Sequence, residues 1–544
     1  MALIYDVNFD SETRVLSLSD RAGNVISSCE VPSKGNELTL TATVNNSSVR
    51  LIKNGTLSNT YEVNTGSGWT AYTFGTVIIL NSGERCRWRC SAHPTTQGIY
   101  DYVQFVMTGT IEASGNINSM LSRGFEYLTS LSGYAYAFVH LFQDCTSLTQ
   151  APDLPATTLT TNCYSSMFKG CTSLTQAPVL PATTLYQHCY SNMFNGCTSL
   201  TQAPVLTSTN LAKYCYYSMF NGCASLTQAP ELPATTLDQY CYNNMFKGCT
   251  SLTQAPNLSA KNLKDHCYDG MFYGCTSLTQ APVLPATSLY PYCYYSMFNG
   301  CTSLTQAPVL PAKSLYPYCY YSMFDGCTSL VNAPLLPATT LSANCYNSMF
   351  RRCTSLVNAP LLPVTTLAEG CYDSMFTGCH SLIQAPELPA TTLTSSCYHS
   401  MFYGCTALTQ APELPATTLA SSCYVGMFQG CTALTQAPEL PAITLASYCY
   451  YNMFYGCSLI TEVYIAATTT ATDALSQWLY GVAASGTVYA DPSFTDLPTN
   501  SASGVPVGWI RAQLPGTRSI EPEQAPVLRS AKKTKPKFDP YLIP

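Results

Sequence analysis

A 26-residue phrase repeats along most of this chain without insertion or deletion. One copy, "CYSSMFKGCTSLTQAPVLPATTLYQH", begins at Cys163, and the next begins at Cys189. Two sets of cysteines keep this period, one from Cys145 to Cys457 and one from Cys163 to Cys449. A period of 20–50 residues is typical of solenoids, in which each unit buries its apolar face only against its neighbours. The sequence therefore predicts a rod or arc of about thirteen stacked coils, about 60 Å long at ~4.8 Å per coil.

Within each repeat, apolar residues recur at the spacing of one helix face. Leu185, Cys189 and Met193 fall at i, i+4 and i+8, which predicts a helix of about three turns that ends at Gly196. The following segment reads as a short strand, because Pro204 cannot donate to a strand ladder. The predicted fold class is a β-rich N-terminal region, an α/β solenoid whose 26-residue coils each hold a short strand plus a short helix, a small C-terminal cap and an extended tail.

The 28 cysteines would normally indicate an oxidised, secreted scaffold. Because most of them follow the repeat period, we interpret them as small buried hydrophobes, reduced in the core, with intracoil disulfides as the alternative. The spacings C-x7-C and C-x17-C match no common zinc site. Cys86 and Cys90 with His93 offer a possible metal site, but in a strand the two cysteines simply share a face. We expect no metal and no cofactor.

The stretch "MFNGCTSLTQAPVLPATTL" resembles the BspA-like branch of the leucine-rich repeats, whose units read roughly F-x-x-C-x-S-L before an extended segment. In one coil the match is carried by Met193, Phe194, Gly196, Cys197, Ser199 and Leu200. The resemblance covers Cys145 to about Cys457, and with the flanks Asn54 to Ile510. Proteins of this look, some ending like "SGVPVGWI" at Ser503 to Ile510, occur in gut bacteria and in the tailed phages that infect them. The resemblance implies an adhesin or receptor-binding surface, without enzymatic activity in the repeat.

Composition and motifs change along the chain in a way that predicts five parts. "ELTLTATV" alternates apolar and polar residues as a strand does, while Ala137 and Phe142 stand where a repeat would have its cysteine and phenylalanine. The parts are a β-rich N-terminal attachment region (1–118), an N-terminal capping coil (119–144), the leucine-rich repeat solenoid (145–457), a C-terminal cap (458–511) and an extended basic tail (512–544).

The tail is Pro-rich and clusters Lys532, Lys533, Lys535 and Lys537. One interpretation is a disordered solubilising tail. The other is an extended peptide that docks onto another subunit through the apolar anchors Phe538, Tyr541, Leu542 and Ile543. A basic cluster could also touch nucleic acid.

The sequence offers no sign of catalysis, membrane insertion or bulk nucleic-acid binding. The formal charge of −6 argues against a phosphate-binding surface. No apolar run reaches the ~20 residues of a membrane helix, and the first residues lack the basic and apolar regions of a secretory signal. No Walker loop, G-x-S-x-G or H-E-x-x-H motif occurs, and the six histidines are scattered. One slot holds a row of carboxylates, which we interpret as a solvated edge rather than a cation site: Glu231, Glu387, Glu413 and Glu439.

The slots that vary between repeats are filled with Tyr, Ser, Asn and Asp, the residues that dominate antibody paratopes. Neutral drift of exposed positions is the alternative, but on a helix surface drift should favour Lys, Glu, Gln and Ala. The candidate binding residues are Tyr186, His188, Tyr214, Tyr217, Tyr240, Tyr290, Tyr292, Tyr295, Tyr316, Tyr318 and Tyr321. A low-charge surface of this kind suits a glycan or a protein.

The resemblance and the residues together predict a non-enzymatic virion structural protein of a tailed phage, a tail, fibre or decoration protein of the crAss-like group. It would assemble in the host cytoplasm, whose reducing conditions suit many cysteines. We expect partners of two kinds: other virion proteins, held by the N-terminal region or the C-terminal tail, and a host cell-surface glycan or protein. We also expect several copies on the particle or a homo-oligomer. The alternatives are a bacterial surface adhesin of the same repeat family and an enzyme with a repeat targeting module.

Overall fold

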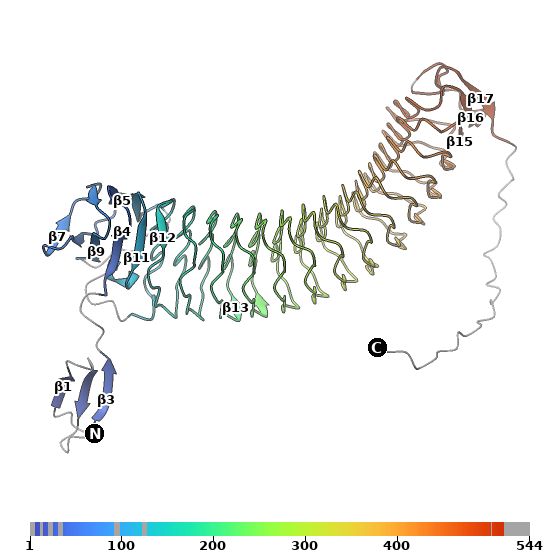
Figure 1. Ribbon diagram of the computed structural model, residues 1–544. Coiled ribbons are helices and arrows are strands. Elements are labelled where there is room, and N and C mark those ends of the chain that lie inside the picture. Colours follow the sequence, from blue (N-terminus) through green and yellow to red (C-terminus); the bar gives the residue numbers. More distant parts are fainter. Residues whose placement is uncertain are drawn as a thin grey trace, which may run out of the picture.

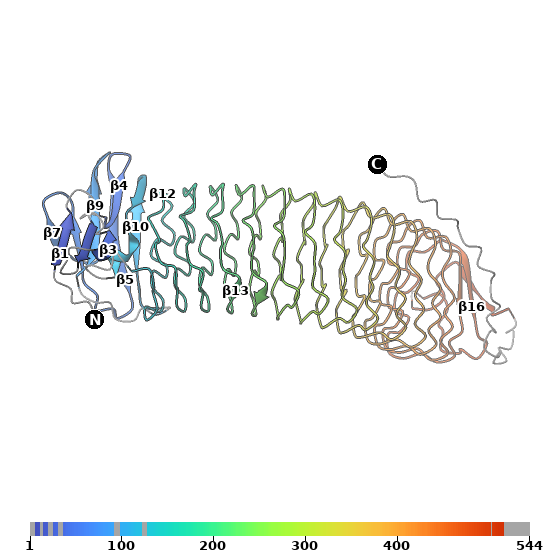
Figure 2. The same ribbon diagram turned by 90° about the horizontal axis from the view of Figure 1, so that it is seen from below.

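Stacked coils fill most of the molecule, with a β-rich unit at one end and a small parallel sheet at the other (Figure 1). This computed structural model describes residues 6–10, 15–19, 25–30, 36–91, 98, 100–121, 128–501 and 503–515. The coils run straight through the green part of the chain and curve in the yellow and orange part (Figure 1), and Figure 2 shows the same stack from below.

The N-terminal strands form three sheets. β1 (Asp6–Asp10), β2 (Val15–Ser19) and β3 (Val25–Glu30) make an antiparallel sheet of their own. A second sheet has the order β10-β5-β8, and a third the order β12-β11-β4-β9-β6-β7. Their bounds are β4 Leu38–Ala42, β5 Ser47–Asn54, β6 Tyr61–Asn64, β7 Trp69–Tyr72, β8 Ile78–Leu80, β9 Arg85–Cys90, β10 Tyr102–Thr108, β11 Ile111–Ser114 and β12 Leu148–Gln150. A 3-10 helix, η1 (Ile117–Met120), follows β11.

The N-terminal unit covers the open end of the solenoid. β11 pairs in parallel with β12, which belongs to the first coil. Phe105 of β10 stacks on Phe142 at 5.3 Å, and Phe142 stacks on Phe168 at 5.5 Å between ring centroids. One hydrophobic core therefore runs without interruption from the β unit into the coils.

Equivalent residues of successive coils lie in columns inside the solenoid. The repeat positions held by Cys189, Tyr190, Met193, Phe194 and Leu200 are essentially fully buried in coil after coil. The phenylalanine rings are nearly parallel, with centroids 5.7 Å apart for both Phe194–Phe220 and Phe220–Phe246. Each coil therefore completes the core of its neighbour, as the period predicts.

The structure contradicts the predicted α/β coil, because the described residues contain no α-helix. The segment expected to be helical is a chain of tight turns whose backbone donors alternate between two tasks. Cys189 N–H and Met193 N–H donate to carbonyls three residues back, whereas Asn192 N–H and Phe194 N–H donate to the next coil at 2.7 and 2.9 Å. A helix would use all these donors internally and leave none for the neighbouring coil. The solenoid is consequently a β-solenoid type of stack, joined coil to coil by backbone hydrogen bonds.

Left-handed backbone conformations make these turns possible. His188, Tyr190 and Asn192 have φ values of 60°, 60° and 53°, and Gly196 has 78°. Alternation of this kind excludes a helix, in which every residue is right-handed. One feature of the sequence does indicate left-handed residues, although the spacing of the apolar residues favours a helix. The slot before Met-Phe, Asn192 in this coil, holds only Ser, Asn or Gly in every repeat, and Asn and Gly are the residues that best tolerate positive φ.

The extended side of each coil forms little regular strand. β13 (Asn210–Leu211) and β14 (Thr236–Leu237) pair in parallel, and single parallel bridges join equivalent residues elsewhere, as between Gln202 and Gln228. At the C-terminal end β15 (Glu462–Ile465), β16 (Gly486–Ala490) and β17 (Trp509–Gln513) form a parallel sheet in the order β15-β16-β17. Trp478 is fully buried there and donates its indole N–H to the Gly504 carbonyl at 2.9 Å.

Candidate binding surface

Six aromatic rings from successive coils stack into one continuous column. Each ring belongs to the residue directly before a cysteine of the set that runs from Cys163 to Cys449. Neighbouring rings are nearly parallel, and their centroids lie 4.4–4.8 Å apart. At one end, Asn344 donates its side-chain N–H to the Tyr318 hydroxyl at 3.3 Å. We call this set the aromatic column: His188, Tyr214, Tyr240, His266, Tyr292 and Tyr318.

Two adjacent coils widen the column into a patch of tyrosines. Tyr290 stacks on Tyr316 at 5.7 Å, and both are exposed. Tyr295 stacks on Tyr321 at 4.9 Å, and each of these also meets the aromatic column at 5.8 Å. We call the six rings of these two coils the tyrosine cluster: Tyr290, Tyr292, Tyr295, Tyr316, Tyr318 and Tyr321.

The structure thus brings most of the candidate residues together. Tyr217 contacts Tyr214 edge-on at 5.8 Å. Tyr186 is exposed but has Ala212 in its slot of the next coil, so it does not continue a stack. Sequence reasoning missed His266, although it occupies the same repeat slot as His188. The predicted tail anchors Phe538, Tyr541, Leu542 and Ile543 lie outside the described residues.

The rings of the aromatic column stand on left-handed backbone, with φ between 58° and 61°. Most other coils fill this slot with smaller residues such as Asn344, Gly370 or Ser396, which suit the conformation better, and one holds Tyr448. A left-handed backbone conformation costs a residue with a large side chain about 1–2 kcal/mol. Each stacked aromatic pair contributes about 0.5–1.5 kcal/mol, which offsets much of this cost. The column therefore adds little net stability, and backbone geometry gives no reason for choosing aromatic residues at this slot.

The rings of the aromatic column and the tyrosine cluster carry little charge themselves, although Lys213, Lys264, Asp265 and Asp269 lie beside them. Burial and the nearby Lys213 ammonium lower the pKa of His188, so this ring is neutral at neutral pH. Burial raises the pKa of Tyr292 and of Tyr295, which keeps their hydroxyls protonated. Lys213 lies 5.3 Å from the Tyr214 ring, and Lys264 lies 5.1 Å from the Tyr290 ring. Because stacking covers the ring faces, the column offers a partner mainly ring edges and hydroxyls at coil spacing.

Two histidines pair with carboxylates in the part of the chain that the structure describes. The side chains there include no group of three or more His, Cys, Asp or Glu residues that could hold a metal ion. His266 pairs with Asp269 at 2.8 Å and His399 with Asp373 at 3.2 Å. Cys86 and Cys90 are buried on one face of β9, and His93 lies outside the described residues. The described ranges contain no helix with the length and apolar character of a membrane span.

A stack of coils with a row of side chains along one side defines a solenoid repeat protein, a class that typically serves as a binding scaffold. The model of the BspA type leucine-rich repeat region matches this chain in six copies, over segments between residues 125 and 476. The chain therefore belongs to the BspA-type leucine-rich repeat family, as the sequence predicts.

Other comparisons add little to this assignment. One solved structure with similarity is described as the crystal structure of a TLR13-ssRNA13 complex, with 13% sequence identity and a TM-score of 0.22. That alignment covers 68% of this chain and 61% of the other, so this chain spans less than two thirds of its length. No curated protein matches.

Proposed function

We propose that this protein is a non-enzymatic binding rod whose aromatic column and tyrosine cluster attach to a glycan or protein on a cell surface. The main supporting observation is the unbroken stack from His188 to Tyr318, in a slot where most other coils hold Gly, Ser or Asn and one holds Tyr448. Tyrosine gives large contact area with little side-chain entropy to lose, and its hydroxyl adds hydrogen bonds without a charge to desolvate.

The regular spacing of the column favours an elongated partner. Each coil of the column presents a tyrosine hydroxyl or a histidine ring nitrogen, and this regular row of polar atoms matches groups that recur along a polysaccharide or an extended protein segment. One coil contributes few contacts, but several coils on one rod, and several rods on one particle, raise the overall affinity through avidity.

We place this rod on the virion of a tailed phage, assembled in the host cytoplasm, with the N-terminal β unit joining other virion proteins. The buried free thiols support this placement, because a reducing cytoplasm preserves them. A bacterial surface adhesin of the same family is the second candidate. Mass spectrometry distinguishes the two: the protein is expected in purified phage particles, and its presence in envelope fractions of uninfected cells would favour the adhesin.

The binding surface is tested by replacing all six residues of the tyrosine cluster with Ser, a residue that other coils already hold at each of the three slots involved (Ser342, Ser396 and Ser191). We expect attachment to host cells to fall at least about tenfold while thermal unfolding changes by only a few degrees. The matched control replaces exposed tyrosines outside the cluster, Tyr273, Tyr403 and Tyr480, and is expected to bind normally.

A second variant with Phe at the same six positions keeps the stacking and removes only the hydroxyls. We expect it to lose much of the binding, because edges and hydroxyls are what the column exposes. Full attachment by the folded Ser variant would show that this face is not the binding surface.

A further inference from the structure

A second exposed column runs along another side of the solenoid, at the slot between Pro and Leu-Pro in the "APxLP" segment. Along the rod, the side chains in this slot change from apolar to acidic. In four successive coils the slot holds apolar side chains that are 71–78% exposed: Val283, Val309, Leu335 and Leu361. In the next three coils it holds the exposed carboxylates Glu387, Glu413 and Glu439. We call this column the outer edge.

Grooves lie along the acidic part of the outer edge. One, of about 430 Å³, lies between two coils and is lined by Pro386, Glu387, Pro412 and Glu413 among others. Another, of about 460 Å³, is lined by Glu439, Glu462 and Tyr464 among others. An extended segment could lie in these grooves with its cations near the carboxylates.

The chain leaves the described structure at the end of this same edge. Leu440 pairs with Ile465, Ile465 with Ala490, and Ala490 with Gln513. The residues before them, Glu439, Tyr464, Tyr489 and Ala512, therefore occupy one slot, and Tyr464 stacks on Tyr489 at 4.5 Å. Residues 516–544 follow within a few residues of that slot.

We propose that residues 516–544 fold back along the outer edge of their own molecule. The lysines at 532, 533, 535 and 537 lie over Glu439, Glu413 and Glu387, and the apolar residues that follow, Phe538, Tyr541, Leu542 and Ile543, cover Leu361 and Leu335. This segment carries six basic and three acidic side chains, opposite in sign to the edge beside its exit. The contact would also cover side chains that otherwise form an exposed apolar row.

Distances and chain order agree with this path. The three carboxylates Glu439, Glu413 and Glu387 lie three to five coils from Ala512, which is about 14–24 Å at ~4.8 Å per coil. The apolar residues Leu361 and Leu335 lie about 29–34 Å from Ala512. A random-coil chain of ~19 residues, the separation from Gln513 to Lys532, has a root-mean-square span of about 24 Å, and one of ~25–30 residues spans about 28–30 Å. Basic residues precede apolar residues in the tail, just as carboxylates precede apolar residues along the edge.

Tethering favours the molecule's own edge over that of another copy. A segment joined by a linker of this length experiences an effective concentration in the millimolar range, well above that of a neighbouring molecule in dilute solution. The charge pairs are exposed and individually weak, so the apolar anchors supply much of the affinity.

The test uses the full chain with a photo-crosslinking amino acid in place of Tyr541, prepared as a mixture of isotopically light and heavy protein. We expect crosslinks to residues 331–361, light to light and heavy to heavy. Crosslinks mainly between light and heavy chains would overturn the intramolecular proposal in favour of docking onto another copy. Crosslinks spread over other parts of the surface would overturn the site.

Charge reversal gives the second readout. The triple change Glu387→Lys, Glu413→Lys and Glu439→Lys should lower the crosslink yield at least about fivefold, and adding Lys→Glu at 532, 533, 535 and 537 should restore it. The matched control is Glu231→Lys, in the same slot about 50 Å from Ala512, which should leave the yield unchanged. A yield insensitive to the triple change, or one that the tail changes fail to restore, would contradict the proposed pairing.

Discussion

At the scale of single residues, the repeat cysteines join neighbouring coils through their thiol hydrogens. Cys197 Sγ–H donates to the Phe168 carbonyl at 3.1 Å, and Cys189 Sγ–H donates to the Thr160 carbonyl at 3.0 Å. Cysteine suits the position because it is a small hydrophobe with a weak donor. Alanine would leave the carbonyl without this donor.

These thiols should make the protein sensitive to alkali. Burial raises the pKa of Cys163, Cys197 and Cys215 from 9.0 to about 12. A group whose folded pKa is raised stabilises the fold fully below its unfolded pKa, here about pH 9, and contributes about 1.4 kcal/mol less for each pH unit above it. Many thiols share this shift, so their summed loss of stability between about pH 9 and about pH 11 exceeds a typical free energy of unfolding of about 5–15 kcal/mol. We therefore expect cooperative unfolding in this pH range.

Thiolate absorbance and near-UV circular dichroism, followed together during the titration, check this expectation. Both signals should change at the same pH. Thiolates that form while the native spectrum persists would show that the thiols are accessible to solvent.

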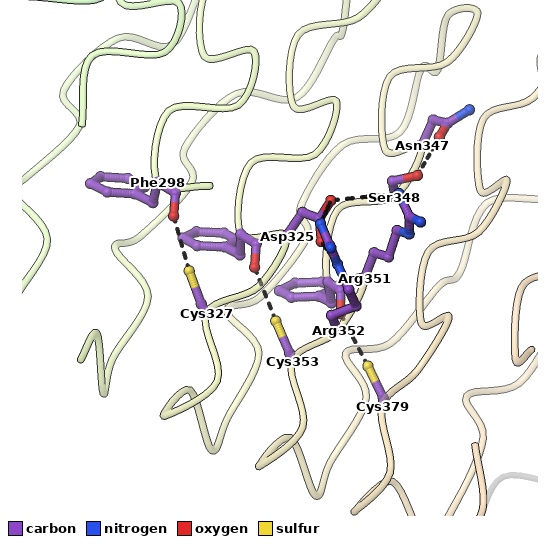
Figure 3. Close-up of polar contacts among 11 residues, drawn as sticks. Phe298, Asp325, Cys327, Asn347, Ser348, Arg351, Arg352, Cys353 and Cys379 are labelled. Carbon is purple, nitrogen blue, oxygen red and sulfur yellow. Dashed lines mark hydrogen bonds and ion pairs between the residues drawn. The ribbon is translucent and has the colours of Figure 1, made fainter. Parts of the chain in front are cut away.

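One coil departs from the repeat by placing Arg352 where other coils have glycine (Figure 3). Arg352 has a φ of 57° and reaches back one coil to the buried Asp325 carboxylate, with contacts of 2.9 and 3.0 Å. Arg351 lies 3.9 Å from the same carboxylate. Arg352 therefore combines a strained backbone conformation with an ion pair to the preceding coil.

Changing Arg352→Gly should destabilise the protein by about 1–3 kcal/mol, because it removes two hydrogen bonds to the buried Asp325 carboxylate and leaves it only the weaker contact with Arg351 at 3.9 Å. The double variant Asp325→Asn with Arg352→Gly reproduces the residues of other coils, and we expect it to be within about 1 kcal/mol of the parent. Chemical denaturation of the parent, both single variants and the double variant measures the coupling. Simple additivity of the two changes would contradict the pairing.

At the scale of the element, the coil is a unit that cannot stand alone. About half of the backbone donors in its turn segment serve the next coil, and its rings stack on both neighbours. Stability in such an array is approximately a sum of repeat and interface contributions.

Deleting one whole coil, residues 275–300, should therefore leave a folded and shorter rod. The deletion joins Gly274 to Cys301, restores the repeat phrase and places Tyr318 next to His266 in the aromatic column. We expect the thermal midpoint to fall by only a few degrees. Deleting residues 275–287 alone breaks the register and should destabilise the protein much more; similar effects of the two deletions in thermal unfolding would argue against stacking at the 26-residue period.

At the scale of the whole molecule, the period predicted the solenoid, because only stacked neighbours can bury the same residues at every repeat, and the resemblance of the repeat residues predicted the family. The local conformation could not be derived the same way. The spacing of Leu185, Cys189 and Met193 fits a helix face as well as a chain of stacked turns, and only the restriction of the Asn192 slot to Ser, Asn and Gly distinguishes them. The variable slots pointed to the tyrosines of the column, but the stacking that links them depends on the left-handed backbone and was not foreseen.

The helical content of the purified protein, measured by far-UV circular dichroism, tests this account most directly. A strand–turn–helix coil would place about 11 of every 26 repeat residues in helix, roughly 40% of the solenoid. We predict a helical content close to zero, since the described residues hold only the short 3-10 helix Ile117–Met120. A content of a third or more would contradict the stack of turns and, with it, the left-handed backbone on which the aromatic column stands.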